Sequence, residues 1–190
     1  MAKGRFFPVQ TVDTGPKGNI GTMLKPVSAK GPWKGQLGSV TEAEGKLWRL
    51  VQLDYDGSAV DTIDGGLLYW EDRSLFTVHT DASAGEALAQ GVAGGCHQVV
   101  DVSALTEDQY LWVQVGGDQA AVVVAASAVA GDALSGHAAT DNVLTRTAAG
   151  TAAVDMQVGV CLSTRGTTTS DESASVANSA KVRWVIGNML

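Results

Sequence analysis

A two-residue hydrophobic period runs through the chain from about Lys46 onward, and it constrains the fold more than any other feature. The clearest runs are 46–53 (KLWRLVQL), 110–115 (YLWVQV) and 181–186 (KVRWVI), while 120–126 (AAVVVAA) has no polar face and is expected to be a strand buried on both sides. Successive side chains of a β-strand point to opposite faces, so such runs predict strands. Many short strands without alternating helices predict an all-β fold, either a jelly-roll-like β-sandwich or a barrel, with very little helix.

The turns between these runs predict the local connections. Asp72-Arg73-Ser74 separates 67–71 from 75–79, and Gly116-Gly117-Asp118 separates 110–115 from 120–126, so we expect two hairpins, the second signal being the stronger. Residues 98–102 and 142–147 are weaker strand candidates, and 83–90 is the one short helix candidate. Residues 163–179, with nine Ser or Thr, are expected to form an exposed loop.

The alternation also predicts which side chains are buried. In 156–162, Met156, Val158, Val160 and Leu162 alternate with Gln157, Gly159 and Cys161. We expect the core to include Val122, Val123, Val124, Val158, Val160, Val182, Trp184 and Ile186. Cys96 and Cys161 lack metal-binding spacing, so we expect two buried free thiols, although a disulfide stays open at this stage.

Charge divides the chain into two parts. Residues 1–35 hold six basic residues and one acid, a net +5, together with all four prolines, whereas residues 36–190 hold seven basic and nineteen acidic residues, a net −12. Proline disfavours helix at its own position and the one before it. We therefore expect an extended basic arm over 1–35, without secondary structure of its own, and an acidic β-domain over 36–190.

Large apolar side chains are interleaved with the charges of this arm. A solvent-exposed linker seldom carries so many, so we expect the arm to bind a partner, with its packing against the acidic body as the alternative. The expected binding residues are Lys3, Arg5, Phe6, Phe7, Lys17, Met23, Leu24, Lys25, Lys30, Trp33 and Lys34. The charges are dispersed and the body is acidic, which favours an acidic protein surface and disfavours nucleic acid.

The sequence offers no recognisable catalytic or cofactor-binding motif. His79, His97 and His137 are widely separated, and His79 is expected to end a strand at a sheet edge. Asp54, Asp56, Asp61 and Asp64 lack the complete calcium loop and are interpreted as solvated turn acids. We expect no catalytic residue, no metal and no cofactor, and hence not an enzyme. Without a long apolar run or a signal peptide, a membrane role is not expected either.

Several short motifs resemble the small β-rich head proteins of tailed phages. They are 65–72 (GGLLYWED), 91–94 (GVAG), 110–117 (YLWVQVGG), 130–134 (AGDAL) and 158–162 (VGVCL), which together cover residues 45–190 and leave the arm outside. The resemblance implies a capsid decoration, or cement, protein, made in the host cytoplasm. It implies binding to the major capsid protein on the outer capsid surface of the virion, as a homo-oligomer with a trimer favoured. A tail, head-fibre or fibre-base component and a cellular β-fold binding module are the alternatives.

Overall fold

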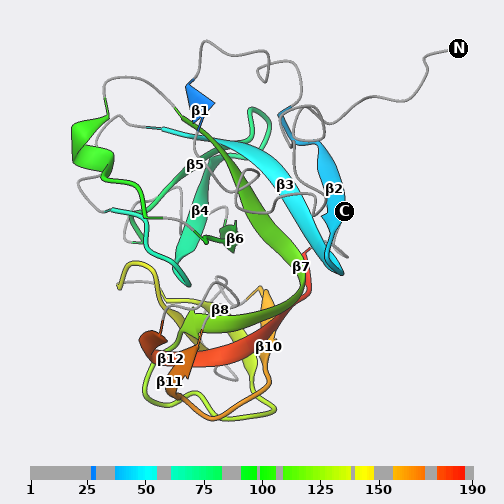
Figure 1. Cartoon of the computed structure of the whole chain (residues 1–190), viewed down its shortest axis with the longest axis vertical. Helices are drawn as coiled ribbons and strands as arrows, with labels where there is room; N and C mark the ends of the chain where they lie inside the picture. The colour runs from blue at the N-terminus through cyan, green and yellow to red at the C-terminus, as the bar shows by residue number, and fades with distance from the viewer. Residues whose placement is uncertain are drawn as a thin grey trace, which may run out of the picture.

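The computed structural model describes residues 27–28, 37–54, 61–82, 91–97, 99–105, 109–137, 140–147, 156–169 and 175–186. Its larger part is a closed ring of five strands (Figure 1), which confirms the all-β prediction and forms a barrel. Around the ring the strands are β3 (Lys46–Leu53), β5 (Thr77–His79), β4 (Leu67–Asp72), β6 (Val92–Gly95) and β7 (Gln109–Val123). Pairing of β3 with β7 closes the ring, and β3–β5 is its one parallel pair.

A second sheet continues from the far half of β7. Next to β7 lies β12 (Ser175–Trp184), followed by β10 (Gly159–Cys161), β8 (Ala133–Gly136) and β9 (Leu144–Arg146), and β11 (Gly166–Thr169) also pairs with β12. Figure 1 shows this sheet below the barrel, with β7 running into both. Two short strands flank the barrel: β2 (Val40–Ala43) pairs with β3, and β1 (Val27–Ser28) pairs with β7. The 3-10 turn η2 (Val102–Ala104) precedes β7.

Strand β7 joins the two parts because Gly116 and Gly117 bend it without reversing it. Residues before this pair face β3, and residues from Gly117 onward face β12. Gly117 has a φ of +82°, and a Cβ there would lie 2.7 Å from the Gly45 carbonyl oxygen, so only glycine fits without strain. The predicted hairpin at this point is wrong: the same glycines that suit a turn also suit a bent strand.

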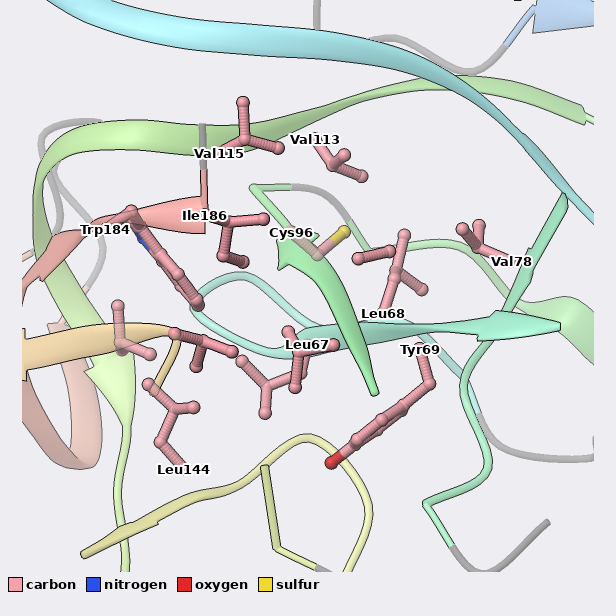
Figure 2. Close-up of a cluster of buried hydrophobic side chains, with 14 of the residues drawn as sticks. Leu67, Leu68, Tyr69, Val78, Cys96, Val113, Val115, Leu144, Trp184 and Ile186 are labelled. Atoms are coloured by element: carbon pink, nitrogen blue, oxygen red, sulfur yellow. The ribbon is translucent and has the colours of Figure 1, made fainter. Parts of the chain in front are cut away.

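One hydrophobic core serves both parts of the molecule. Figure 2 shows side chains from the barrel strands, among them Leu67 and Val113, gathered with Leu144 and Trp184 of the second sheet. The indole of Trp184 donates a hydrogen bond of 2.8 Å to Gln119 Oε1, and the Gln119 amide donates to the Cys96 carbonyl at 3.3 Å. The two parts are therefore packed as a single unit.

Most of the expected core residues are buried. Trp184 and Ile186 are at most 6% exposed, and so are Val122, Val124, Val158 and Val182. Val123 and Val160 are half-buried instead. The expected phase of 156–162 holds at Val158 but is wrong at Met156, Val160 and Leu162, which are exposed or half-buried, and at Gly159 and Cys161, which are buried.

The expected alternation fails because small residues of this strand face the hydrophobic core. Cys161 belongs to the buried cluster, and Gly159 leaves room for Val182, to which a Cβ would come within 2.9 Å. Met156 is 39% exposed. Both cysteines are buried free thiols, as expected.

The predicted hairpin of β4 and β5 is confirmed, and Asp72 Oδ1 accepts hydrogen bonds in its turn from the amides of Ser74 (2.7 Å) and Leu75 (3.3 Å). Strand β9 lies inside the weaker candidate 142–147. Of the candidate 98–102, the structure describes 99–102, and these residues contribute one bridge, Val100 to Thr62, instead of a strand.

The expectations for the loop 163–179 and for part of the arm need correction, and the structure does not test the helix candidate. The loop expected at 163–179 is wrong over much of its length, because β11 pairs with the start of β12 through backbone hydrogen bonds that Ser and Thr make as well as any residue. In the arm, Val27–Ser28 is a strand on β7, so the expectation of no secondary structure is wrong there. The helix candidate 83–90 falls outside the described residues.

Candidate functional site

All eleven arm residues expected to bind a partner lie outside the described residues. What the structure does place is the strand next to them in sequence. Val27 is opposite Tyr110, and Ser28 is opposite Gln109, at the start of β7. The basic segment is therefore joined to the barrel at this strand.

A cavity of about 120 Å³ lies against the barrel between strands β3, β4 and β6. Its lining is apolar except for two guanidinium groups, and consists of Arg49, Trp70, Arg73, Phe76, Val92, Met156 and Ile186. Arg73 and Met156 are exposed, which places one side of the cavity at the surface, while Trp70, Val92 and Ile186 are buried and form its inner wall. The site thus combines a buried apolar wall with two positively charged side chains.

Arg49 is the unusual residue of this cavity, because its side chain is only 3% exposed. It stands in β3 on the same strand face as Val51 and Leu53, which belong to the hydrophobic core. The centre of its guanidinium lies 5.9 Å from the ring centroid of Trp70, within cation–π range. Among the residues that the structure describes, neither Nε nor Nη2 of Arg49 has a hydrogen-bond partner.

The electrostatics of Arg49 reflect this position. Burial, and secondarily the charge of Arg73, lower the pKa of the Arg49 guanidinium. An arginine nevertheless stays protonated in proteins, so the charge remains. Arg73 at the rim adds a second positive charge rather than compensating the first.

A second arginine in the chain shows the more common arrangement. Arg183 of β12 is exposed, and its Nε and Nη2 donate hydrogen bonds of 2.7 and 3.3 Å to the two carboxylate oxygens of Asp118 on β7. Lys181 Nζ lies 3.4 Å from the same carboxylate. These donors lower the pKa of Asp118, the Arg183 hydrogen bond most of all. In return, the hydrogen bond and the charge of Asp118 raise the pKa of Arg183.

The three histidines are held in different surroundings. His97 is buried, with Nε2 2.7 Å from Gln114 Oε1 and its ring centroid 5.0 Å from that of Trp48. His79 ends β5 as expected, but β5 lies between β3 and β4, so its predicted place at a sheet edge is wrong. The main-chain oxygen of His137 accepts a hydrogen bond from the Tyr69 hydroxyl at 3.5 Å.

Of the candidate acids, Asp61 serves local structure. Asp61 Oδ1 accepts from the Val102 amide at 2.9 Å, while Asp56 lies outside the described residues. Across the described ranges, no group of three or more His, Cys, Asp and Glu side chains is placed to hold a metal ion. No helix in the described part of the chain is long and apolar enough to cross a membrane.

Comparison with models of known protein families, with curated protein sequences and with solved structures finds no match for this chain. The sequence analysis missed the Arg49 cavity. The cavity could have been suspected from Arg49 in KLWRLVQL. This arginine has the same strand parity as Leu47, Val51 and Leu53, where an apolar residue is the norm.

Proposed function

We propose that this chain is a structural, non-catalytic protein of a tailed-phage virion that binds the outside of the capsid and bridges neighbouring major capsid protein subunits. The motif resemblance over residues 45–190 supports the class. The attachment of the basic segment to the barrel through β1 is the observation that carries the binding mode. A segment of charge +5 fixed to a body of charge −12 suits an acidic surface that the body alone would repel.

Two truncations test the role of the basic segment. Deleting residues 1–25 removes Lys3, Arg5, Lys17 and Lys25 but keeps β1. We expect a folded body that no longer co-sediments with particles assembled from the major capsid protein of the same phage. Deleting residues 1–30 also removes β1 and its pairing with Tyr110, so this variant should be less stable as well.

The controls separate binding from folding. Circular dichroism and urea unfolding report whether each truncated body is intact, and sedimentation without particles reports aggregation. Undiminished binding by the folded 1–25 deletion would contradict the proposed role of the segment. Failure of the full-length chain to bind the particles would contradict the capsid role itself.

We propose further that the chain assembles as a homo-oligomer, with a trimer favoured. In the described sheet order, β2 and β9 are terminal strands, and a sheet edge offers unpaired backbone groups to a neighbouring chain. Light scattering of the free protein should give a mass of about three times 19.6 kDa. A monomer mass at every concentration would contradict self-assembly in solution.

A further inference from the structure

The geometry points to a ligand site that the proposed function does not require: we propose that the Arg49 cavity binds a carboxylate group carried on a short apolar stem. The carboxylate would pair with Nε and Nη2 of Arg49, and the stem would lie against Trp70, Val92 and Ile186. The side chain of a partner's glutamate and a free short-chain acid share this chemistry.

The first argument is the cost of the buried charge. A guanidinium that is 3% exposed has lost nearly all contact with water. Burying an ion without a hydrogen-bonded counter-charge costs several kcal/mol even after the protein relaxes. The Trp70 ring offsets part of this cost, but a ring face does not accept the in-plane N–H groups. The group best suited to both nitrogens at once is an anion.

The second argument is the shape of the donor pair. Nε and Nη2 lie on one edge of the guanidinium and bind the two oxygens of a carboxylate side by side. This chain uses the same two atoms in its own Arg183–Asp118 pair, at 2.7 and 3.3 Å. In Arg49 the equivalent two atoms lack a partner among the described residues and are closed to water, so a ligand reaches them only by displacing neighbouring side chains of the lining.

The third argument is the character of the walls. Apart from Arg49 and Arg73 the lining is entirely apolar, which favours a ligand with a hydrocarbon stem over a fully solvated anion such as phosphate. About 120 Å³ exceeds the space of one water several times over. Met156 at the exposed side is a side chain that adapts readily to a neighbour.

The experiment uses the full-length protein with butanoate as the probe and butanamide as its neutral isostere. Arginine Nε–H signals are followed by ¹H–¹⁵N correlation spectroscopy at neutral pH and low ionic strength. We expect butanoate to shift the Arg49 signal in a saturable manner, and butanamide and inorganic phosphate to shift it much less. An Arg49 signal that ignores butanoate, or responds equally to butanamide, would overturn the proposal, including the case in which an acid of this chain already occupies the two nitrogens.

Variants test whether butanoate binding depends on the paired donors Nε and Nη2 of Arg49, called the fork below. Arg49→Lys keeps the charge but loses the paired donors, and should weaken butanoate binding about tenfold or more, measured by calorimetry. Arg183→Lys is the matched control on the exposed pair and should leave binding unchanged. Equal affinity of the Arg49→Lys and wild-type proteins would contradict the role of the fork. If Arg49→Lys does not fold, the wild-type titrations with butanoate and butanamide still decide.

A final arm separates the two sources of the carboxylate. Blocked tripeptides Ala-Glu-Leu and Ala-Gln-Leu are compared with butanoate. Tighter binding of the glutamate peptide than of either other probe identifies a protein side chain as the ligand, whereas preference for butanoate identifies a free acid. Capsid binding is not needed for any of these measurements, so the two proposals can fail separately.

Discussion

The barrel and the second sheet each carry an arginine on a strand, and the two arginines differ in burial and in pairing. In the barrel, Arg49 occupies the core-facing side of β3 and is 3% exposed, whereas Arg183 of the second sheet faces outward and pairs with Asp118. An exposed ion pair of this kind contributes little to stability. Among the residues that the structure describes, no group accepts a hydrogen bond from Nε or Nη2 of Arg49, and burial of a guanidinium in that state opposes folding.

The largest expected effect breaks the connection between the two regions. Trp184 of the second sheet is 2% exposed and packs against β6 of the barrel at Gly95, where a Cβ would come within 2.6 Å of the indole. Trp184→Ala should lower the free energy of unfolding by about 3–5 kcal/mol. Urea unfolding followed by circular dichroism and by fluorescence should show one coincident transition, because the core is shared.

The control for this change is Leu75→Ala, at a side chain that is 61% exposed, which should leave the urea midpoint almost unchanged. Two separate transitions in the Trp184→Ala protein would show that the barrel and the second sheet fold independently.

The next effect concerns the bend that carries β7 from one region into the other. Gly117→Ala forces a left-handed backbone on alanine and brings its Cβ to 2.7 Å from the Gly45 carbonyl oxygen. We expect a loss of roughly 2–4 kcal/mol from the conformational strain and the clash together. Gly131→Ala, at φ +95° with open space around the Cβ, isolates the conformational part and should cost about 1–2 kcal/mol. Equal urea midpoints for the two variants would remove the clash from the explanation.

A change of opposite sign sharpens the contrast between the two arginines. Arg49→Met replaces the buried charge with an apolar side chain of similar length and should raise the free energy of unfolding by about 1–3 kcal/mol. Arg183→Met removes an exposed, paired charge and should give no such gain. Chemical denaturation of both variants and the wild type measures the difference. A destabilised Arg49→Met protein would mean that the guanidinium is compensated within the chain.

The alternation of apolar and polar residues predicted the fold correctly where a strand has one buried and one exposed face. Val182 and Trp184 alternate with exposed Lys181 and Arg183, and the structure keeps that alternation. The pattern failed where small residues face the core, because Cys161 and Gly159 look neutral in sequence yet are buried by their neighbours β8 and β12. Burial there depends on partners distant in the chain.

The same limit explains the junction and the cavity. Gly116-Gly117 satisfies both a tight turn and a bent strand, and the choice is made by β3 and β12, which flank it on successive stretches. The sequence shows that Arg49 is a charged residue at a position where the strand alternation predicts a buried side chain. It does not show which residues surround that side chain. Trp70, Met156 and Ile186 reach the cavity from three separate segments, which only the closed barrel brings together.

The smallest expected effect compares two half-buried aspartates whose pKa values are lowered for different reasons. Asp118 of the second sheet owes its lowered pKa mainly to Arg183, whereas Asp72 in the barrel hairpin owes its own to hydrogen bonds from Ser74. A pKa that is lower in the folded than in the unfolded chain means that folding releases protons. Each stabilisation is therefore present above the pKa of the unfolded aspartate and is lost as pH falls through the lowered pKa of the folded state.

Asp118→Asn and Asp72→Asn should each lower the urea midpoint slightly at neutral pH, and both differences from the wild type should vanish in strong acid. Salt then separates them. At about 1 M NaCl, where charges are screened within about 3 Å, the effect of Asp118→Asn should shrink because it depends on an ion pair. The effect of Asp72→Asn should persist, because its donors are the amide and hydroxyl of Ser74 and the amide of Leu75, which carry no net charge. Equal salt sensitivity of the two variants would show that the exposed pair on the second sheet does not act through its charge.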